Sequence, residues 1–129
     1  MQETTRLIWL KRTLLVKILV VALMWGLPSW IAPAGVLKLF GVEMPADPFY
    51  MRIFGGVLMG LVFLYWLAYR NPVKNRDIIR YAVVDNTLSF LTILGVGLTT
   101  GIRNPVIWVS AVLVALFAVA FYVLMPKPV

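Results

Sequence analysis

The sequence predicts an all-α protein, a transmembrane four-helix bundle with one short segment at the outer membrane surface. Hydrophobic residues make up 62% of the 129 residues, more apolar surface than a soluble domain of this size can bury. Apolar stretches of about 20 residues, the length that crosses a bilayer, occur four times between short polar connections. We expect a single transmembrane domain over residues 1–129, with spans at about 13–32, 49–69, 78–98 and 106–125.

The first predicted span follows a basic segment that resembles the start of a signal peptide. The apolar stretch is long for a signal peptide and no cleavage pattern follows it, so we expect a retained span. Lys17 lies one turn inside this span, and we expect its side chain to extend back to the cytoplasmic headgroups. Pro28 is expected to kink or end the helix.

Residues 33–47 form the longest connection, and they are too apolar for a free loop. We expect a short helix in the outer interface, interrupted at Gly41 and stopped by Pro45. Asp47 and Pro48 then predict the start of the second span, with a capping carboxylate and a proline in the first turn.

Small residues in two of the spans predict close helix packing. Gly55, Gly56 and Gly60 form a ridge on the second span, which allows backbones to approach each other in lipid. Packing is the favoured interpretation of this ridge, over a ligand crevice. In the fourth span, Ala111 and Ala115 suit packing against another helix.

The third span carries an unusual polar stripe. Asp85, Ser89 and Thr92 fall at positions i, i+4 and i+7, with Tyr81 one turn earlier and Asn86 adjacent. A carboxylate at this depth is costly unless another helix covers it. The stripe either contacts a proton path, a quinone-like molecule or a lipid headgroup, or it joins helices through a protonated or hydrogen-bonded carboxyl group. The structural role is slightly favoured, because one acid without a second titratable partner makes a poor proton relay.

Arg52 lies near the outer end of the second span. It either extends to the interface and binds a lipid phosphate, or turns into the bundle toward an anionic group. The helical rise separates it from Asp85 by roughly 15 Å in depth, so Glu43 or Asp47 are the expected partners.

The basic residues predict the orientation. Nine of the twelve fall on the side of the N-terminus, and three on the other side. This bias places both termini in the cytoplasm and fits a multi-pass protein of the bacterial inner membrane. The inner set is Arg6, Lys11, Arg12, Lys17, Arg70, Lys74, Arg76, Arg80 and Lys127, and the outer set is Lys38, Arg52 and Arg103. We therefore interpret the net charge of +7 as a result of membrane topology and of contact with anionic lipid headgroups, and not as a sign of nucleic-acid binding.

The chemical inventory is small. The chain has no cysteine and no histidine, which removes thiolate chemistry, the usual metal ligands and the commonest general base. We therefore expect no catalytic residues, no metal and no cofactor.

Residues 52–60, Arg52-Ile53-Phe54-Gly55-Gly56-Val57-Leu58-Met59-Gly60, resemble the second-helix signature of DoxX-like small bacterial membrane proteins. Residues 44–50 and 67–72 also resemble a branch of that family. The resemblance implies a compact four-helix membrane protein, sometimes found beside quinone-linked or redox partners. Arg52 stands where that family has an acidic residue, so a role that depends on the acid does not carry over.

Two functions are consistent with these observations. The first is a non-catalytic accessory or structural subunit of a larger inner-membrane complex, of redox or energy-converting type, with lipids and other membrane subunits as partners. The redox part rests on family analogy alone. The alternative is a small quinone- or lipid-binding membrane protein, or a minimal transporter, that uses the polar stripe around Asp85.

Overall fold

The computed structural model describes residues 2–129, which are mostly helical and contain no strand in that range. Within this part of the chain, four helical segments are long and apolar enough to cross a membrane: Glu3–Ile31, Phe49–Arg70, Arg76–Thr100 and Pro105–Leu124. The prediction of an all-α bundle with four membrane-spanning helices is confirmed. The chain is a multi-pass membrane protein.

The first span is built from three consecutive pieces: α1 (Glu3–Val20), a π-helical turn η1 (Val21–Gly26) and α2 (Leu27–Ile31). The helix begins ten residues before the apolar stretch, since the basic N-terminal segment continues the same helix. The π turn comes directly before Pro28, whose ring cannot fit against the carbonyl group of Met24 in a regular helix. The wider turn accommodates the proline inside the span, and the Leu27 N–H bonds instead to the carbonyl oxygen of Ala22.

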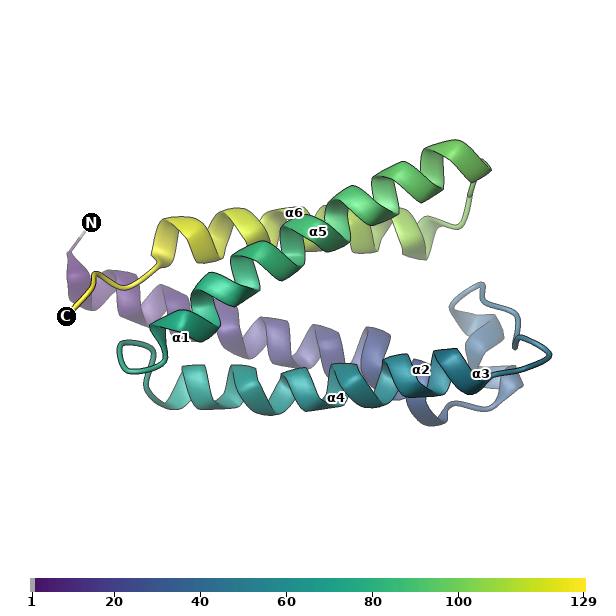
Figure 1. Cartoon of the computed structure of the whole chain (residues 1–129), viewed down its shortest axis with the longest axis horizontal. Helices are drawn as coiled ribbons and strands as arrows, with labels where there is room; N and C mark the ends of the chain where they lie inside the picture. Colours follow the sequence, from purple (N-terminus) through teal and green to yellow (C-terminus); the bar gives the residue numbers. More distant parts are fainter. Residues whose placement is uncertain (1) are drawn as a thin grey trace.

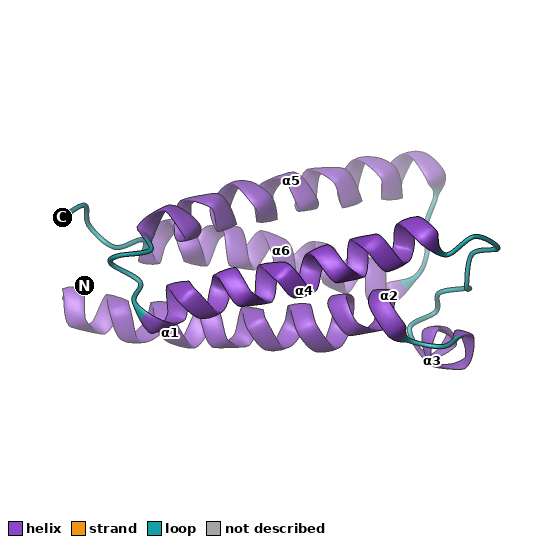
Figure 2. Ribbon diagram, turned by 60° about the horizontal axis from the view of Figure 1, so that its bottom comes forward, coloured by secondary structure: helices purple, strands orange, loops and turns teal. Residues whose placement is uncertain are grey.

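Three further long helices complete the bundle: α4 (Phe49–Arg70), α5 (Arg76–Thr100) and α6 (Pro105–Leu124). Figure 1 shows α5 and α6 as one antiparallel pair and α1 with α4 as another, while α1 also contacts α6. Figure 1 shows α4 and α5 close together at the 71–75 connection and diverging toward the opposite end, while Figure 2 shows all four long helices running along the same axis. Both termini lie at the end where α4 and α5 meet.

The connection between the first and second spans contains α3 (Ala34–Leu39), a short helix with Leu37 buried. The helix ends before Gly41, which adopts a positive φ of 70°, the conformation in which glycine commonly terminates helices. The side-chain amide of Asn104 donates to the carbonyl oxygens of Phe40 and Gly41, while its oxygen accepts from the N–H of Val106. One residue therefore caps α6 and attaches the connection to it.

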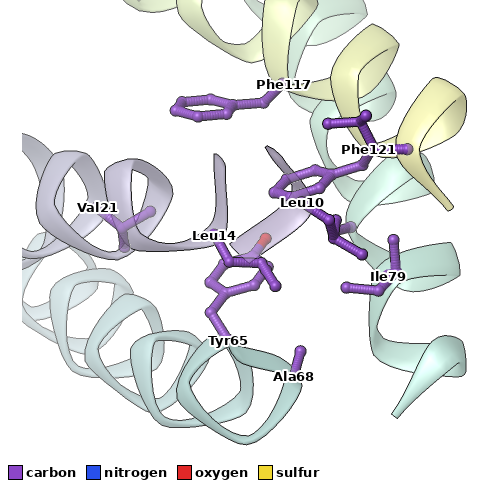
Figure 3. Packing of buried hydrophobic residues seen from close by; sticks show 10 residues of the cluster. Leu10, Leu14, Val21, Tyr65, Ala68, Ile79, Phe117 and Phe121 are labelled. Atoms are coloured by element: carbon purple, nitrogen blue, oxygen red, sulfur yellow. The ribbon is translucent and has the colours of Figure 1, made fainter. Parts of the chain in front are cut away.

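The main hydrophobic core lies toward the end of the bundle that holds the termini. Figure 3 shows Leu10 and Leu14 of α1, Tyr65 of α4, Ile79 of α5 and Phe121 of α6 converging there. The Tyr65 and Phe121 rings stack with centroids 6.2 Å apart. All four spanning helices thus contribute to one core.

The three glycines of the predicted ridge on α4 differ in how closely another helix approaches them. A side chain at Gly55 would collide with the backbone of Trp30, so glycine is required where α2 crosses α4. Gly56 lies beside the Trp30 indole, whereas Gly60 faces open space. On α6, Ala111 is buried and Ala115 is partly buried by the chain's own helices.

Candidate functional site: a polar cluster inside the bundle

The centre of the site is a lysine buried among the helices. Lys17 is only 2% exposed, and its Nζ donates a hydrogen bond of 2.6 Å to Oδ1 of Asn86 on α5. The Asn86 side chain is fully buried, and its Nδ2 donates to the carbonyl oxygen of Ala82 at 2.7 Å. Both polar atoms of the amide are therefore used within the bundle.

The expectation that Lys17 extends to the headgroups is wrong, because this residue lies on the buried face of α1. Leu10, Leu14, Lys17 and Val21 recur at spacings of four, three and four residues, and all four are buried. That spacing is typical of a helix face that packs into a core. The spacing of these residues in the sequence therefore indicated that Lys17 faces inward. The prediction failed because it was based on the charge of the side chain.

Three aromatic rings surround the ammonium group. The Nζ of Lys17 lies 4.6 Å from the ring centroid of Phe117, 5.0 Å from that of Trp25 and 5.8 Å from that of Tyr65. Contacts at these distances stabilise a cation through the negative face of the ring. Trp25 is itself fixed by a 2.9 Å hydrogen bond from Nε1 to Oγ of Ser110.

The Tyr65 hydroxyl group is buried beside this cluster. Figure 3 shows the Tyr65 side chain entering the core from α4, with its oxygen directed toward the interior. The hydroxyl lies near the Asn86 amide but has no hydrogen-bond partner among residues 2–129. An unpaired buried hydroxyl costs free energy, so a hydrogen-bond acceptor brought to it would stabilise the cluster.

Asp85 lies at the edge of the cluster and is half-buried. It adjoins Asn86, the acceptor of Lys17, but within residues 2–129 it forms no ion pair within 4 Å and no side-chain hydrogen bond. The other stripe residues follow the same margin of α5, with Ser89 half-buried and both Tyr81 and Thr92 exposed. Only Asn86 of the predicted α5 residues enters the core.

Arg52 does not contact this cluster and lies instead at the C-terminal end of the first span. Its guanidinium group donates to the carbonyl oxygens of Ser29 at 3.3 Å and Ala32 at 2.8 Å. These carbonyls lie where α2 ends, so the arginine supplies donors that the helix itself lacks. The expected ion pair with Glu43 or Asp47 does not form in the described chain, and Asp47 instead accepts from the N–H of Phe49.

The structure therefore joins residues from all four spans into one polar cluster. Sequence reasoning selected Asp85 and Asn86 but missed Lys17, Tyr65 and Trp25. No protein-family model, curated protein or solved structure matches this chain. The chemistry of the cluster is the remaining guide to function: a cation, a carboxylate, a phenol and an amide lie together in an otherwise apolar bundle.

Proposed function

We propose that this chain is a non-catalytic protein of the bacterial inner membrane that binds the polar head of a bilayer-soluble ligand, a quinone or a lipid, at the cluster around Lys17 and Asp85. The observation that carries the proposal is the unused hydrogen-bonding capacity of two groups, Asp85 at the edge of the cluster and the buried Tyr65 hydroxyl inside it. Asp85 and the Tyr65 hydroxyl have no hydrogen-bond partner among residues 2–129, although Asp85 adjoins Asn86, the acceptor of Lys17, and the Tyr65 ring centroid lies 5.8 Å from the Lys17 Nζ.

A purely structural polar contact between helices would use its donors and acceptors within the bundle. Asn86 does so, but Lys17 donates only one of its three N–H groups to a side chain in the described part. Removing charged groups from water costs several kcal/mol each unless further hydrogen bonds satisfy them. A ligand hydroxyl would donate to the half-buried Asp85, and a ligand carbonyl or phosphate oxygen would accept from Tyr65 or Lys17 once the side chains that bury these two donors move aside.

The positive-inside bias supports the inner-membrane location with both termini in the cytoplasm. The resemblance of residues 52–60 to DoxX-like proteins supports the quinone class by analogy only. On this arrangement the cluster lies in the cytoplasmic half of the bilayer, which a ligand would reach laterally from the lipid.

The experiment is ligand retention by the purified protein in lipid nanodiscs that contain decylubiquinone. We expect Asp85→Asn and Tyr65→Phe each to lower the bound quinone about tenfold, the effect of losing one well-placed hydrogen bond. Asp77→Asn is the matched control, because this aspartate lies on the same helix with a side chain 91% exposed and bonded only to Arg80. Equal retention by all four proteins, with unchanged melting temperatures, would contradict quinone binding. Retention of phospholipid that depends on Asp85 would assign the site to lipid.

A second candidate is the accessory subunit of a larger membrane complex. The limited contact between α4 and α5, which diverge in Figure 1, favours it. Apolar side chains on both helices, such as Leu64 of α4 and Leu88 of α5, stay exposed and could contact a helix of another subunit. Gentle detergent extraction, a native gel and mass spectrometry of the band test this reading. Migration with a stoichiometric set of larger subunits supports it, and migration of the chain by itself rejects it.

A further inference from the structure

We propose a second, independent site: a groove at the outer end of α2 and α4 that binds a zwitterionic phospholipid with a primary amine. The groove is open and has a volume of about 700 Å³. Trp30 closes one side, Asp47 and Arg52 form its polar rim, and Phe49, Ile53 and Val57 line its apolar part. None of the residues that line the groove belongs to the cluster around Lys17, so this proposal does not rest on the function proposed above.

The rim holds hydrogen-bond donors that the protein does not use. Arg52 directs three N–H groups to Ser29, Ala32 and Met44, and the other two have no acceptor among residues 2–129. The Trp30 indole lies against Gly56, and its N–H likewise lacks an acceptor in the described chain. A guanidinium and an indole N–H together suit a phosphate group.

The rim also holds an acceptor. One carboxylate oxygen of Asp47 accepts the N–H of Phe49 at 3.0 Å, and the residue is exposed. Asp47 and Arg52 line the same groove but do not form an ion pair within 4 Å. Neither charge is neutralised by the other, so the carboxylate can pair with a cationic group and the guanidinium with an anionic group of the same ligand.

The lower part of the groove fits an acyl chain. Phe49, Ile53 and Val57 recur every four residues along α4, and each is at least half exposed. At the helical rise they extend about 12 Å from the rim into the membrane. An amphipathic ligand with its head at the rim would cover this stripe, whereas free phosphate would leave it uncovered.

Charge complementarity selects the headgroup. A phosphate beside Arg52 places a headgroup amine within reach of Asp47, and a primary ammonium can donate to the carboxylate. A choline headgroup has no N–H to donate. A phosphoglycerol headgroup brings a negative charge to the same rim without any cation to offset Asp47.

The test uses nanodiscs made from equal amounts of phosphatidylethanolamine, phosphatidylglycerol and phosphatidylcholine. After transfer of the protein to mild detergent, native mass spectrometry measures the lipids that remain bound. We expect the wild type to retain phosphatidylethanolamine above its bulk proportion. Asp47→Asn, which keeps the size of the side chain and its ability to cap Phe49, should lower the ratio of ethanolamine to glycerol lipid about tenfold.

Glu43→Gln is the matched control, because Glu43 is an exposed acid on the same connection and does not line the groove. Trp30→Phe should lower the total amount of retained phospholipid without changing the ratio. Retention of the lipids in bulk proportion by the wild type would overturn the proposal. An equal fall in the ratio of ethanolamine to glycerol lipid in Asp47→Asn and Glu43→Gln would overturn it as well. The ratio would then depend on the total negative charge of residues 33–47 and not on a specific site.

Discussion

The Nζ of Lys17 and the Oδ1 of Asn86 lie 2.6 Å apart in the interior of the bundle, although 69 residues separate them in the chain. Over residues 2–129 the backbones of α1 and α5 barely approach each other. The long lysine side chain therefore bridges two helices that are not close neighbours. Its hydrogen bond connects the α1–α4 pair with the α5–α6 pair.

Lys17→Met should lower the free energy of unfolding by about 1–3 kcal/mol, because it leaves the buried Asn86 oxygen without its donor. Thermal unfolding in detergent, followed by helical circular dichroism, measures the change. The double variant Lys17→Met with Asn86→Leu removes both polar partners and should regain part of the loss. A double variant that loses the sum of the two single effects would show that the hydrogen bond is not the cause.

Gly55→Ala should destabilise the protein by about 1–3 kcal/mol, the usual cost of overpacking. The new methyl group would meet the backbone of Trp30, which cannot move aside as a side chain can. Gly60→Ala is the matched control on the same helix, where open space surrounds the position. It should be neutral or stabilise the helix by about 0.5–1 kcal/mol. Similar melting temperatures for the two variants would contradict the close crossing of α2 and α4.

Asn104→Ala should cost about 1–2 kcal/mol through loss of the α6 cap and should also release the outer connection. Asn104→Asp separates the two effects, since the carboxylate still accepts from Val106 but cannot donate to Phe40 and Gly41. We expect proteolysis within residues 40–48 to accelerate in both variants. Stability should fall less in Asn104→Asp than in Asn104→Ala. Unchanged proteolysis of both would show that the connection is held elsewhere.

Cysteine labelling tests the proposed orientation without background, because the natural chain has no cysteine. Lys38→Cys on α3 and Lys127→Cys in the C-terminal segment both replace exposed residues. A maleimide that cannot cross membranes should label Lys38→Cys in intact spheroplasts, and Lys127→Cys only after permeabilisation. The reverse pattern would invert the topology and place the Lys17 cluster in the outer half of the bilayer.

The four spans follow from apolar runs of membrane-crossing length, and the sequence alone predicts them well. The start of α6 was also predictable, because Asn104 and Pro105 form a cap and a first-turn proline whose effect is local. The inward position of Lys17 could also have been predicted, because the spacing of Leu10, Leu14 and Val21 is typical of a buried helix face. A long charged side chain predicted near the end of a span usually extends to the headgroups. The expectation for Lys17 followed that rule and did not use the helical spacing of its neighbours.

Other features depend on contacts that no local pattern encodes. The Arg52 guanidinium bonds to the carbonyl oxygens of Ser29 and Ala32, and only the crossing of α2 and α4 in three dimensions brings these groups together. The unpaired Tyr65 hydroxyl likewise depends on where α4 faces α5. The polar stripe on α5 identified Asp85 either as a ligand contact or as a structural contact between helices, but its helical spacing could not tell which neighbouring helix faces it.

The π turn between Val21 and Gly26 fixes the rotational phase of the first span. One residue corresponds to about 100° of rotation around a regular helix, so the extra residue in this turn sets the direction in which Trp30 faces. Shortening the turn by one residue would preserve the hydropathy of the span and its ability to insert. It would nevertheless swing Trp30 away from Gly55 and turn Pro28 out of its buried position. Single-residue insertions or deletions here should therefore be far less tolerated than substitutions between apolar side chains.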